Sequence, residues 1–447
     1  MKPPIHSTEP LTTIDLLLNP QWMIPIDPPG VTLQDYALAI TGGRIIDLLP
    51  QQVALQRYQP LEVLNLPNQV LIPGFVNLHT HAAMSLLRGY ADDLPLMTWL
   101  QEHIWPAETR HVSPEFVKAG TQLACAEMLR GGVTCFNDMY FFPEAAADAV
   151  REAGIRAALG MIVVEFPSVY ASNADDYIAK GLSARDNNSG NPLISFCFAP
   201  HAPYTVSNHS FERIGALAEQ IDVQIHLHLH ETRSEIEDSV NKFGVRPFER
   251  LDSIGIIGPR MIGVHAVHLT LDEIDLIRRK GVHIAHCPTS NLKLGSGIAP
   301  MAAIEAARIN FGFGTDGAAS NNRLDPFQEL RHAALLAKGA SGNAAAMATH
   351  SALHGATLGG AKALGLDTTI GSLTPGKSAD ICVIRLDEWI NQPCFDPASH
   401  LVFVAGREQV SHVWVAGKQQ VANGELINFD LLSLIKSTEI WHTRIKS

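Results

Sequence analysis

Two histidines separated by a single residue suggest a metal site near residue 80. His79 and His81 end an apolar run in the tripeptide "HTH". Side chains alternate across a β-strand, so residues two apart face the same side and both imidazoles can reach one ion. Neutral imidazole is the commonest metal ligand in proteins. A pair of solvated or core histidines would have the same spacing, so the metal interpretation needs further ligands.

A second histidine-rich run lies farther along the chain, in "IHLHLHET". It places His226, His228 and His230 in one phase of a strand, and Glu231 follows directly. Each buried polar side chain must find a partner, so this density of imidazoles predicts a polar site. Periodicity does not choose among the three histidines. Glu231 is placed either to shuttle protons, as general acid–base catalysis requires, or to cap the helix that follows.

Three later apolar runs also end in residues that can bind metals or protons: His265 and His268, then His283 and His286, and finally Asp316 in "GTDG". An isolated "TDG" is usually a turn. If the ends of these runs meet, one oxygen of Asp316 can bind a metal while the other accepts a proton from water. A zinc-type ion lowers the pKa of water towards about 7, so the predicted chemistry is hydrolysis.

These residues need a fold in which strand ends converge, and the chain between about residues 70 and 316 predicts one. Short β-branched runs alternate there with longer helical patterns, as in βα units around a parallel sheet. Eight candidate strands occur, at 71–79, 132–138, 155–164, 192–200, 222–230, 261–267, 281–287 and 309–315. Eight such units predict an α/β protein with a TIM (β/α)8 barrel, whose active site lies at the C-terminal ends of the strands.

The flanking segments predict a second, smaller domain. Residues 1–69 and 371–426 contain Gly-punctuated alternating stretches typical of antiparallel strands. We expect them to pair into one small β-sandwich-like domain built from both termini. The metal-dependent hydrolase barrel would then span residues 70–370, and residues 427–447 would form a C-terminal helix.

The composition argues against several classes of protein. The chain has 447 residues, of which 46% are hydrophobic and 17% charged, and its net charge is -12. This acidic balance, without a cluster of Lys and Arg, argues against a nucleic-acid or membrane surface as partner. The six cysteines show neither CxxC nor disulfide spacing, the N-terminus lacks the apolar stretch of a signal peptide, and no run of about 18 apolar residues occurs. We expect a cytoplasmic protein.

The lysine content bears on the number of metal ions. Binuclear hydrolases of this architecture bridge two ions with a carboxylated lysine on the fourth strand. Between Met139 and Pro200 the only lysine is Lys180, which falls in a predicted helix or loop. We therefore expect one divalent ion per subunit, with Zn2+ as the expected element. The HxE and PCxxC motifs of the cytidine-deaminase zinc site do not occur in the chain.

Four segments of the chain resemble one enzyme family. "PGFVNLHTHAAMSLLRGYADDLPLMTWL", "HLHET", "HCPTSNLKLGSGIAP" and "GTDGAASNN" are similar to motifs of the amidohydrolase superfamily. More narrowly, nearly the whole chain resembles the 5-methylthioadenosine/S-adenosylhomocysteine deaminases. The resemblance implies hydrolytic deamination of an adenosine derivative, 5′-methylthioadenosine or S-adenosylhomocysteine, to the inosine analogue and ammonia. The motifs are less specific for the substrate than for the superfamily.

The resemblance also implies catalytic roles. The implied metal ligands are His79, His81, His228 and Asp316. Glu231 resembles the proton shuttle that protonates the adenine ring, and Asp316 takes a proton from water. His265 resembles the histidine that steadies the attacking hydroxide and the tetrahedral intermediate.

Four further positions are implied to bind the substrate. Trp99 would pack against the nucleoside and Glu108 would accept hydrogen bonds from the ribose hydroxyls. His201 would contact the nucleoside, and Ser320 would lie near the substrate. One position departs from the family: Met161 stands where some members carry an arginine for the homocysteine carboxylate. Methionine cannot pair with a carboxylate, which favours an uncharged 5′ substituent.

Two other functions are alternatives. Another deaminase or chlorohydrolase of the same branch would act on guanine, adenosine or an s-triazine. Glu108 discriminates against the free bases, because they have no ribose for it to bind. A non-catalytic amidohydrolase-like assembly protein would be expected to have lost metal ligands. Family members are commonly dimers or larger, so we expect a homo-oligomer, either a dimer or a tetramer.

Overall fold

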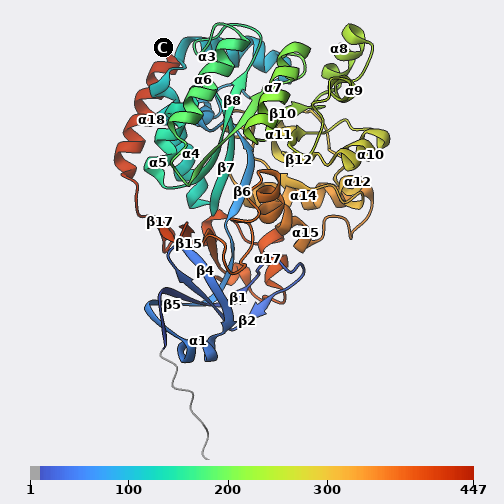
Figure 1. The fold of residues 1–447 in the computed structure, drawn as a ribbon. Coiled ribbons are helices and arrows are strands. Elements are labelled where there is room, and N and C mark those ends of the chain that lie inside the picture. The colour runs from blue at the N-terminus through green and yellow to red at the C-terminus, as the bar shows by residue number, and fades with distance from the viewer. Residues whose placement is uncertain (1–10) are drawn as a thin grey trace, which may run out of the picture.

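The computed structural model describes residues 11–447. The first ten residues, which hold the start of the predicted β domain and most of the N-terminal stretch without signal-peptide character, lie outside the described residues. The chain forms a large α/β part and a smaller β-rich part, with a narrow region between them (Figure 1). None of the helices in residues 11–447 combines the length and the hydropathy that crossing a bilayer requires.

Eight parallel strands form the centre of the large part: β6 (Phe75–Thr80), β7 (Val133–Tyr140), β8 (Arg156–Val163), β9 (Ile194–Pro200), β10 (Ile225–Leu229), β11 (Met261–His265), β12 (His283–His286) and β13 (Phe311–Phe313). They pair in sequence order from β6 to β13. Beyond the end of β13, the Asp316 N–H donates to the carbonyl of His79 at 3.0 Å, so the last strand meets the first. The predicted (β/α)8 barrel is confirmed.

One predicted strand is divided between two sheets. Residues 71–79 were expected to form a single barrel strand, but Leu71 to Pro73 end β5 (Tyr58–Pro73), a strand of the other sheet. Gly74 separates them from β6, and a Cβ there would lie 2.2 Å from the Thr134 side chain. The apolar run therefore passes from one sheet into the other at Gly74. Only glycine fits there, because any larger side chain would collide with Thr134. Periodicity alone does not show this change of sheet.

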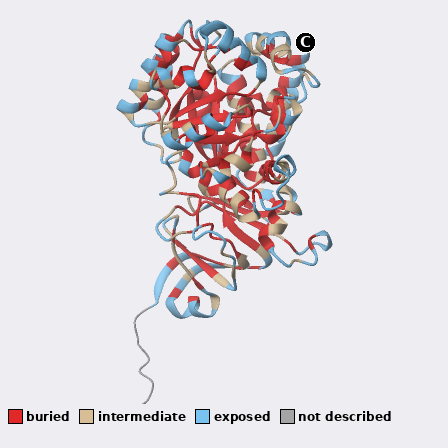
Figure 2. Ribbon diagram, turned by 90° about the vertical axis from the view of Figure 1, so that its right-hand side faces the viewer, coloured by how far each residue is buried: buried red, intermediate tan, exposed pale blue. Residues whose placement is uncertain are grey.

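Helices surround the barrel strands. The larger ones are α4 (Pro114–Arg130), α5 (Pro143–Ala153), α6 (Ala174–Asn187), α7 (Asn208–Ile221), α8 (Arg233–Phe243), α9 (Pro247–Ser253), α10 (Leu271–Lys280), α12 (Met301–Ala306) and α14 (Pro326–Ser341). Their ends follow local rules: the Ser113 hydroxyl caps α4, and Thr270 and Glu273 form a capping box on α10. The strands are almost wholly buried, while the helices expose their outer faces (Figure 2).

Short elements lie over the barrel and between its strands: η1 (Ala82–Leu87), α2 (Leu96–Thr98), the π-helical turn η2 (Trp99–Ile104), α3 (Trp105–His111), α11 (Pro288–Lys293), α13 (Ala318–Asn321), α15 (Thr349–His354), η3 (Gly355–Gly359) and α16 (Gly360–Ala363). Several of them follow the C-terminal ends of strands, where a barrel enzyme carries its active site.

The second sheet combines both ends of the chain. Its order is β17-β16-β15-β14-β5-β1-β3-β4, with β2 beside β1. The strands are β1 (Thr12–Met23), β2 (Leu33–Gln34), β3 (Tyr36–Thr41), β4 (Arg44–Pro50), β14 (Ile381–Arg385), β15 (Val410–Val415), β16 (Lys418–Ala422) and β17 (Glu425–Leu426), with β5 as above. Antiparallel pairing of β5 with β14 joins the two ends, as predicted. The residue limits proposed for the domains stay a prediction.

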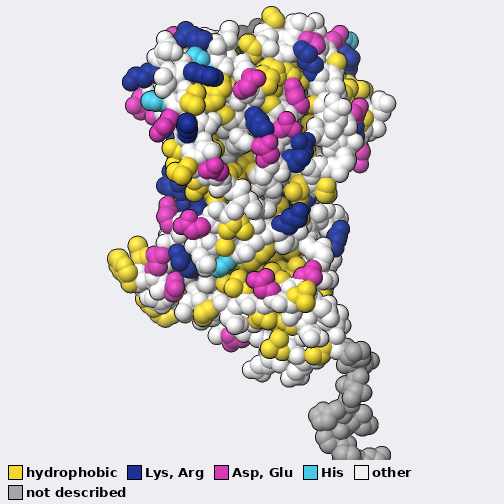
Figure 3. Space-filling view, turned by 90° about the vertical axis from the view of Figure 1, so that its left-hand side faces the viewer, with side chains coloured by type: hydrophobic (Ala, Val, Ile, Leu, Met, Phe, Trp, Pro, Cys, Tyr) yellow, Lys and Arg dark blue, Asp and Glu magenta, His cyan; other side chains and the backbone are white. Residues whose placement is uncertain are grey.

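The remaining helices are α1 (Gln51–Arg57), η4 (Trp389–Asn391), α17 (Pro397–Phe403), η5 (Arg407–Gln409) and α18 (Leu431–Lys446). The last of these is the C-terminal helix, which packs on α4 through an edge contact between Trp441 and Phe116 at 5.3 Å. Charged side chains of both signs are dispersed over the face in Figure 3.

Candidate metal centre and active site

A cavity of about 330 Å³ opens at the C-terminal ends of the barrel strands. Its lining includes five of the polar residues predicted from sequence to do chemistry: His81, His228, Glu231, His265 and Asp316. Most of the remaining lining is apolar. A concave, largely apolar site with a few convergent polar groups is the usual form of a small-molecule site.

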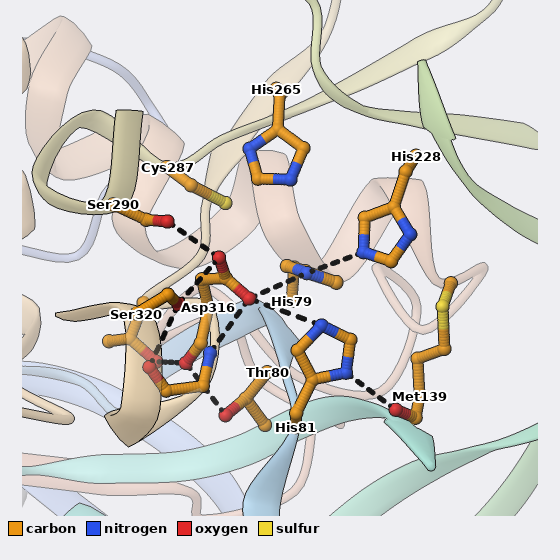
Figure 4. A network of polar contacts seen from close by, with 12 residues as sticks. His79, Thr80, His81, Met139, His228, His265, Cys287, Ser290, Asp316 and Ser320 are labelled. Carbon is orange, nitrogen blue, oxygen red and sulfur yellow. Dashed lines mark hydrogen bonds and ion pairs between the residues drawn. The ribbon is translucent and has the colours of Figure 1, made fainter. Parts of the chain in front are cut away.

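Three imidazoles and one carboxylate come together at this end of the barrel (Figure 4). His79 lies in β6, His81 directly follows that strand, His228 lies in β10 and Asp316 follows β13. The Nε2 atom of His79 lies 3.3 Å from Nε2 of His228 and 3.3 Å from Oδ1 of Asp316. The Nε2 atom of His81 lies 3.2 Å from the same oxygen.

Backbone carbonyls determine which nitrogen of two of these rings carries the proton. The Nδ1 of His81 donates to the carbonyl of Met139 at 2.6 Å, and the Nδ1 of His228 donates to the carbonyl of His201 at 2.7 Å. In a neutral ring, Nε2 then carries no proton and its lone pair can bind a metal. For His79, the Nδ1 lies 2.9 Å from Nε2 of His226, which can accept its proton.

The donor set therefore fits a divalent metal ion. When the three rings are neutral, their lone pairs and the carboxylate oxygen are directed at one point across about 3 Å and repel one another unless a cation lies among them. Three histidines with one carboxylate, and room for water or substrate, are a donor set typical of catalytic zinc. The ligand atoms of His79, His81 and Asp316 all lie within 4.8 Å of one another, as do those of His79, His228 and His265.

The ionisation of these residues agrees with a cation site. Burial lowers the pKa of His79 to about 4, which keeps its ring neutral. Burial also lowers the pKa of His81, but the hydrogen bond and charge of Asp316 outweigh burial and raise that pKa to about 9. Burial raises the pKa of Asp316, yet His79 and His81 hold it well below its usual range. The site favours an ionised carboxylate with positive charge beside it.

Glu231 and His265 lie next to this site. Oε2 of Glu231 is 3.6 Å from Nε2 of His265, and both side chains are buried. Burial raises the pKa of Glu231, so its carboxyl group keeps a proton more readily than a solvated one. His265 lies parallel to His228, with ring centroids 5.4 Å apart.

The three histidines of β10 have three different environments. His228 reaches the cation site, whereas His226 lies behind His79 at 2.9 Å and is wholly buried. His230 follows the end of β10 with a φ of 54°, and its Nε2 accepts from the Phe248 N–H at 3.1 Å. The left-handed backbone at His230 ends the alternation that would have put its side chain in phase with the other two.

Three of the four predicted substrate contacts line the cavity. Trp99 is in η2, Glu108 in α3, and His201 directly after β9. Burial raises the pKa of Glu108 to about 7, although the hydroxyl of Tyr140 donates to its Oε1 at 2.8 Å. Burial lowers the pKa of His201 to about 3, so that ring is neutral. The indole N–H of Trp99 is buried and has no hydrogen-bond partner among residues 11–447.

Ser320 contacts the Asp316 carboxylate. Its hydroxyl donates to Oδ2 of Asp316 at 2.8 Å, and it is not among the residues that line the cavity. In Figure 4 it lies beside the Asp316 carboxylate. A contact between Ser320 and the substrate therefore stays a prediction, and the observed contact is with a candidate metal ligand.

The side chain of Met161 points away from the cavity. A Cβ on Gly181 of α6 would lie 2.7 Å from the Met161 Cβ, so Met161 faces the helix layer and not the cavity. Its neighbour Ile162 lines the cavity instead. The argument against a bound carboxylate cannot rest on Met161, because side chains of adjacent strand residues point to opposite faces.

Several residues of the site were not identified from the sequence. Tyr140, which binds Glu108, ends β7 and could have been found as a polar residue at a strand end. Ser290, Asn291 and Ser296 contact Asp316, His265 and Glu231 respectively. They lie in the motif "HCPTSNLKLGSGIAP", whose roles the sequence alone did not indicate. The histidines His268, His283 and His286 do not line the cavity.

Residues 70–420 match the model of the amidohydrolase family. The chain is 46% identical over 434 residues to a 5-methylthioadenosine/S-adenosylhomocysteine deaminase of Teredinibacter turnerae, which covers 97% of this chain and 98% of that protein. A protein with the same name from Saccharophagus degradans is 45% identical, covering 98% of both chains.

Two solved structures extend the comparison. The crystal structure of an adenosine deaminase from Xanthomonas campestris with bound zinc is similar with a TM-score of 0.96 and 47% identity, covering 98% of this chain and 100% of that one. The zinc complex of atrazine chlorohydrolase from Arthrobacter aurescens has a TM-score of 0.88 and covers 96% of this chain and 100% of that one. Its identity of 24% shows a shared fold alone.

Proposed function

The chain belongs to the amidohydrolase family, and from this premise we propose that it is a metal-dependent deaminase of an adenosine derivative, producing the inosine analogue and ammonia. The observation that carries the proposal is the convergence of three Nε2 atoms and Asp316 Oδ1 beside Glu231 at the cavity. The names of the relatives at 45–46% identity, deaminases of 5-methylthioadenosine and S-adenosylhomocysteine, support it.

His79, His81, His228 and Asp316 would hold one zinc ion per subunit. When bound, the ion supplies the acidity that makes hydroxide available from water near pH 7. Lys180 lies in α6 and donates to the carbonyl of Tyr170 at 2.6 Å. It is therefore not placed to bridge a second ion, which supports a single-metal site.

The residues around the metal site carry the proton transfers. The raised pKa of Glu231 lets its carboxyl group donate a proton to N1 of the adenine ring. His265 presents the lone pair of Nε2 to the attacking water, because its Nδ1 donates to Asn291 at 2.9 Å. Asp316 accepts a proton from that water. The water oxygen bonds to C6, and the proton taken up by Asp316 passes to the amino nitrogen. The bond from C6 to that nitrogen then breaks and ammonia leaves, while the second proton of the water restores the Glu231 carboxyl group.

Glu108 supports a nucleoside substrate over a free base. The Tyr140 hydroxyl occupies Oε1 of Glu108, which leaves Oε2 to accept ribose hydroxyls. Trp99 offers an aromatic face and an unpaired N–H to the same ligand. With guanine or an s-triazine, Oε2 of Glu108 would have no ribose hydroxyl to accept from. A carboxylate oxygen that is removed from water without a hydrogen-bond partner costs free energy.

The cavity lining supports an uncharged 5′ substituent. Among residues 11–447 the lining contains no Lys or Arg, and its charged members are Glu108, Glu231 and Asp316. The apolar members include Leu96, Leu100, Trp105, Phe166, Pro167 and Val169. A methylthio group can be buried against such a wall, whereas the carboxylate of S-adenosylhomocysteine would lack a cationic partner. We therefore propose 5′-methylthioadenosine as the preferred substrate.

We also propose that the protein acts as a homo-oligomer in the cytoplasm. Trp389 and Phe395, which follow β14, are 86% and 92% exposed, and an interface between subunits would cover them. The six cysteines are free, and five of them are buried, as suits a reducing compartment.

A substrate panel tests the proposal. Purified protein is incubated with 5′-methylthioadenosine, adenosine, S-adenosylhomocysteine and guanine, and both ammonia and the absorbance change from adenine to hypoxanthine are followed. We expect kcat/KM to be highest for 5′-methylthioadenosine. Chelation of the metal should abolish the activity and added Zn2+ should restore it. Glu231→Gln should lower kcat by at least about 100-fold, whereas Glu237→Gln on the exposed face of α8 should not. Absence of ammonia with every adenosine derivative would refute the proposal.

A further inference from the structure

The 287–296 segment, Cys287 to Ser296, lies beside the candidate active site but contributes only Leu294 to the cavity lining. It follows β12 and contains α11. None of its polar side chains lines the cavity, although Asn291 contacts Nδ1 of His265. Its position next to the reacting groups therefore raises the question of what its polar side chains bind.

Three buried side chains of the segment contact three different reacting groups. The Ser290 hydroxyl donates to Oδ2 of Asp316 at 2.6 Å (Figure 4). Oδ1 of Asn291 accepts from Nδ1 of His265 at 2.9 Å. The Ser296 hydroxyl donates to Oε1 of Glu231 at 3.1 Å. The exposed fractions of Ser290, Asn291 and Ser296 are 0%, 1% and 6%, so solvent does not compete for these contacts.

Each contact selects one orientation or one proton position. Ser290 and Ser320 both donate to Oδ2 of Asp316, which leaves Oδ1 directed at the Nε2 atoms of His79 and His81. An amide oxygen can accept a hydrogen bond but cannot donate one, so the contact with Asn291 keeps the proton of His265 on Nδ1. Nε2 of His265 then carries no proton, and its lone pair faces Glu231 and the cavity.

The segment is itself held in place by a buried carboxyl group. Glu329 of α14 is 1% exposed, and its Oε2 accepts from the Thr289 N–H at 3.1 Å. Its Oε1 accepts from Nδ2 of Asn321 at 2.8 Å. Asn321 is in α13 next to Ser320. Glu329 therefore holds in place both α13 and the 287–296 segment, which carry the two hydroxyls that bind Asp316. Side chains whose own rotamers are locked in this way can hold a reacting group to within a few tenths of an ångström.

We propose that Ser290, Asn291 and Ser296 are positioning residues of the deamination, acting through Asp316, His265 and Glu231 without touching the substrate. The proposal rests on the proposed function for its kinetic part. It assigns different consequences to the three residues: Ser290 orients a metal ligand, whereas Asn291 and Ser296 orient groups that transfer or accept protons.

The test compares Ser290→Ala, Asn291→Leu and Ser296→Ala in the full-length zinc-loaded protein. Zinc per chain is measured after dialysis against a graded series of chelator concentrations, and kcat and KM are measured with 5′-methylthioadenosine. Loss of a partner behind a ligand or catalytic group typically costs about 10-fold to 100-fold in metal affinity or activity. We expect Ser290→Ala to lose zinc at about 10-fold lower chelator concentration than wild type.

The other two variants should behave differently. Asn291→Leu and Ser296→Ala should retain zinc as wild type does, while kcat falls about 10-fold to 100-fold and KM changes by less than about threefold. Asn291→Asp, which keeps an acceptor for Nδ1 of His265, should recover part of the lost kcat, and Ser296→Thr should do the same.

A matched control separates positioning from a general loss of stability. The buried Ser239 hydroxyl donates to the carbonyl of Val245 at 2.9 Å and contacts none of the reacting groups. Ser239→Ala should change neither zinc retention nor kcat. Equal loss of zinc in all three segment variants, or unchanged kcat in Asn291→Leu and Ser296→Ala, would overturn the proposal. If the wild-type protein deaminates no adenosine derivative, the proposed function fails, and unchanged zinc retention in Ser290→Ala would then overturn this inference separately.

Discussion

Each imidazole of the metal site is oriented by a group on its far side. His81 and His228 donate to the carbonyls of Met139 and His201, and His79 pairs with His226. A ring held by its Nδ1 offers Nε2 to the metal without a rotation that would cost entropy. The His79 and His226 pair also gives a hydrogen-bond partner to a wholly buried histidine that lies outside the cavity lining. The hydrogen bond at Nδ1 therefore orients each ring, and this orientation makes its Nε2 available to a metal.

Glu108 leads to a prediction about pH. Its pKa is raised to about 7 by burial, so the carboxylate is ionised above about pH 7 and protonated below it. Only the ionised form accepts hydrogen bonds with both oxygens. We expect kcat/KM for 5′-methylthioadenosine to fall as the pH decreases from 8 to 6, mainly through a rise in KM. Steady-state kinetics across this range measures the effect.

The variant Glu108→Gln isolates this ionisation from others in the site. It should lower kcat/KM at pH 8 by about tenfold to 100-fold, since it removes hydrogen bonds to a charged group. The remaining activity should lose the pH dependence of KM between pH 6 and 8. If KM of Glu108→Gln still rises below pH 7 as in wild type, a different group is responsible.

At the scale of elements, the ends of the strands decide where the polar side chains point. His265 and Asp316 have φ angles of 71° and 61°, in the left-handed region that is uncommon for residues other than glycine. Strained backbone of this kind concentrates at functional sites. At Asp316 it is offset by the hydrogen bond from its N–H to the His79 carbonyl, which also joins the last strand to the first. The turn therefore both places the proposed metal ligand Asp316 and joins the last barrel strand to the first.

Gly314 lets β6 and the end of β13 approach each other. A Cβ at Gly314 would lie 2.7 Å from the His79 Cβ and 2.8 Å from the His79 nitrogen. Gly314→Ala should therefore push His79 out of the metal site. We expect the free energy of unfolding to fall by about 1–3 kcal/mol, as for other overpacked positions, together with weaker zinc retention. Urea unfolding and metal analysis of the purified variant measure both effects.

Gly339 provides the comparison for Gly314. It lies in α14, and a Cβ there would meet no atom within 4 Å. Gly339→Ala should stabilise the protein by about 0.5–1 kcal/mol, because alanine favours the helix, and should leave zinc unchanged. The interpretation of the close approach is wrong if Gly314→Ala binds zinc as tightly as Gly339→Ala.

In the whole molecule, a buried ion pair joins the barrel to the second sheet. Arg156 begins β8, and its guanidinium donates to both carboxylate oxygens of Asp380 at 3.1 Å. Asp380 directly precedes β14, and its Oδ1 also accepts from the Ala416 N–H at 2.9 Å. The exposed fractions of Arg156 and Asp380 are 5% and 3%. A buried ion pair between residues far apart in the sequence thus holds the barrel and the second sheet together.

Removal of one partner of this ion pair should destabilise the protein as a whole. Asp380→Asn leaves the Arg156 charge buried without its counter-ion, and breaking a buried pair in this way costs about 3–5 kcal/mol. We expect a lower urea midpoint of a single cooperative transition. The kcat of the molecules that remain folded should be unchanged, because Asp380 lies outside the cavity lining.

A double-mutant cycle with Arg156→Met tests the pairing itself. The double variant Arg156→Met/Asp380→Asn should cost less free energy of unfolding than the sum of the two single variants. Additive losses would show that the two residues act independently and that the join between the sheets depends on other contacts.

The amino-acid sequence determined the architecture and the chemical types in the site. Eight βα repeats predicted the barrel, and the strand-end positions of His79, His81 and Asp316 predicted that they meet, because parallel strands bring their carboxyl ends to one side. These inferences succeed because periodicity and strand order are local properties of the chain. The superfamily resemblance is confirmed by the family match and by relatives at 45–46% identity.

The tertiary structure alone decided what each side chain touches. Alternation put His226, His228 and His230 in one phase. Only the depth in the barrel and the turn after β10 show that His226 supports His79, that His228 is the proposed metal ligand and that His230 points elsewhere. Similarly, Met161 faces a helix, and Ser320 binds Asp316. The physical reason is that strand periodicity specifies the face on which a side chain lies, whereas its partner comes from a strand or loop distant in sequence. That partner is known only when the barrel has closed.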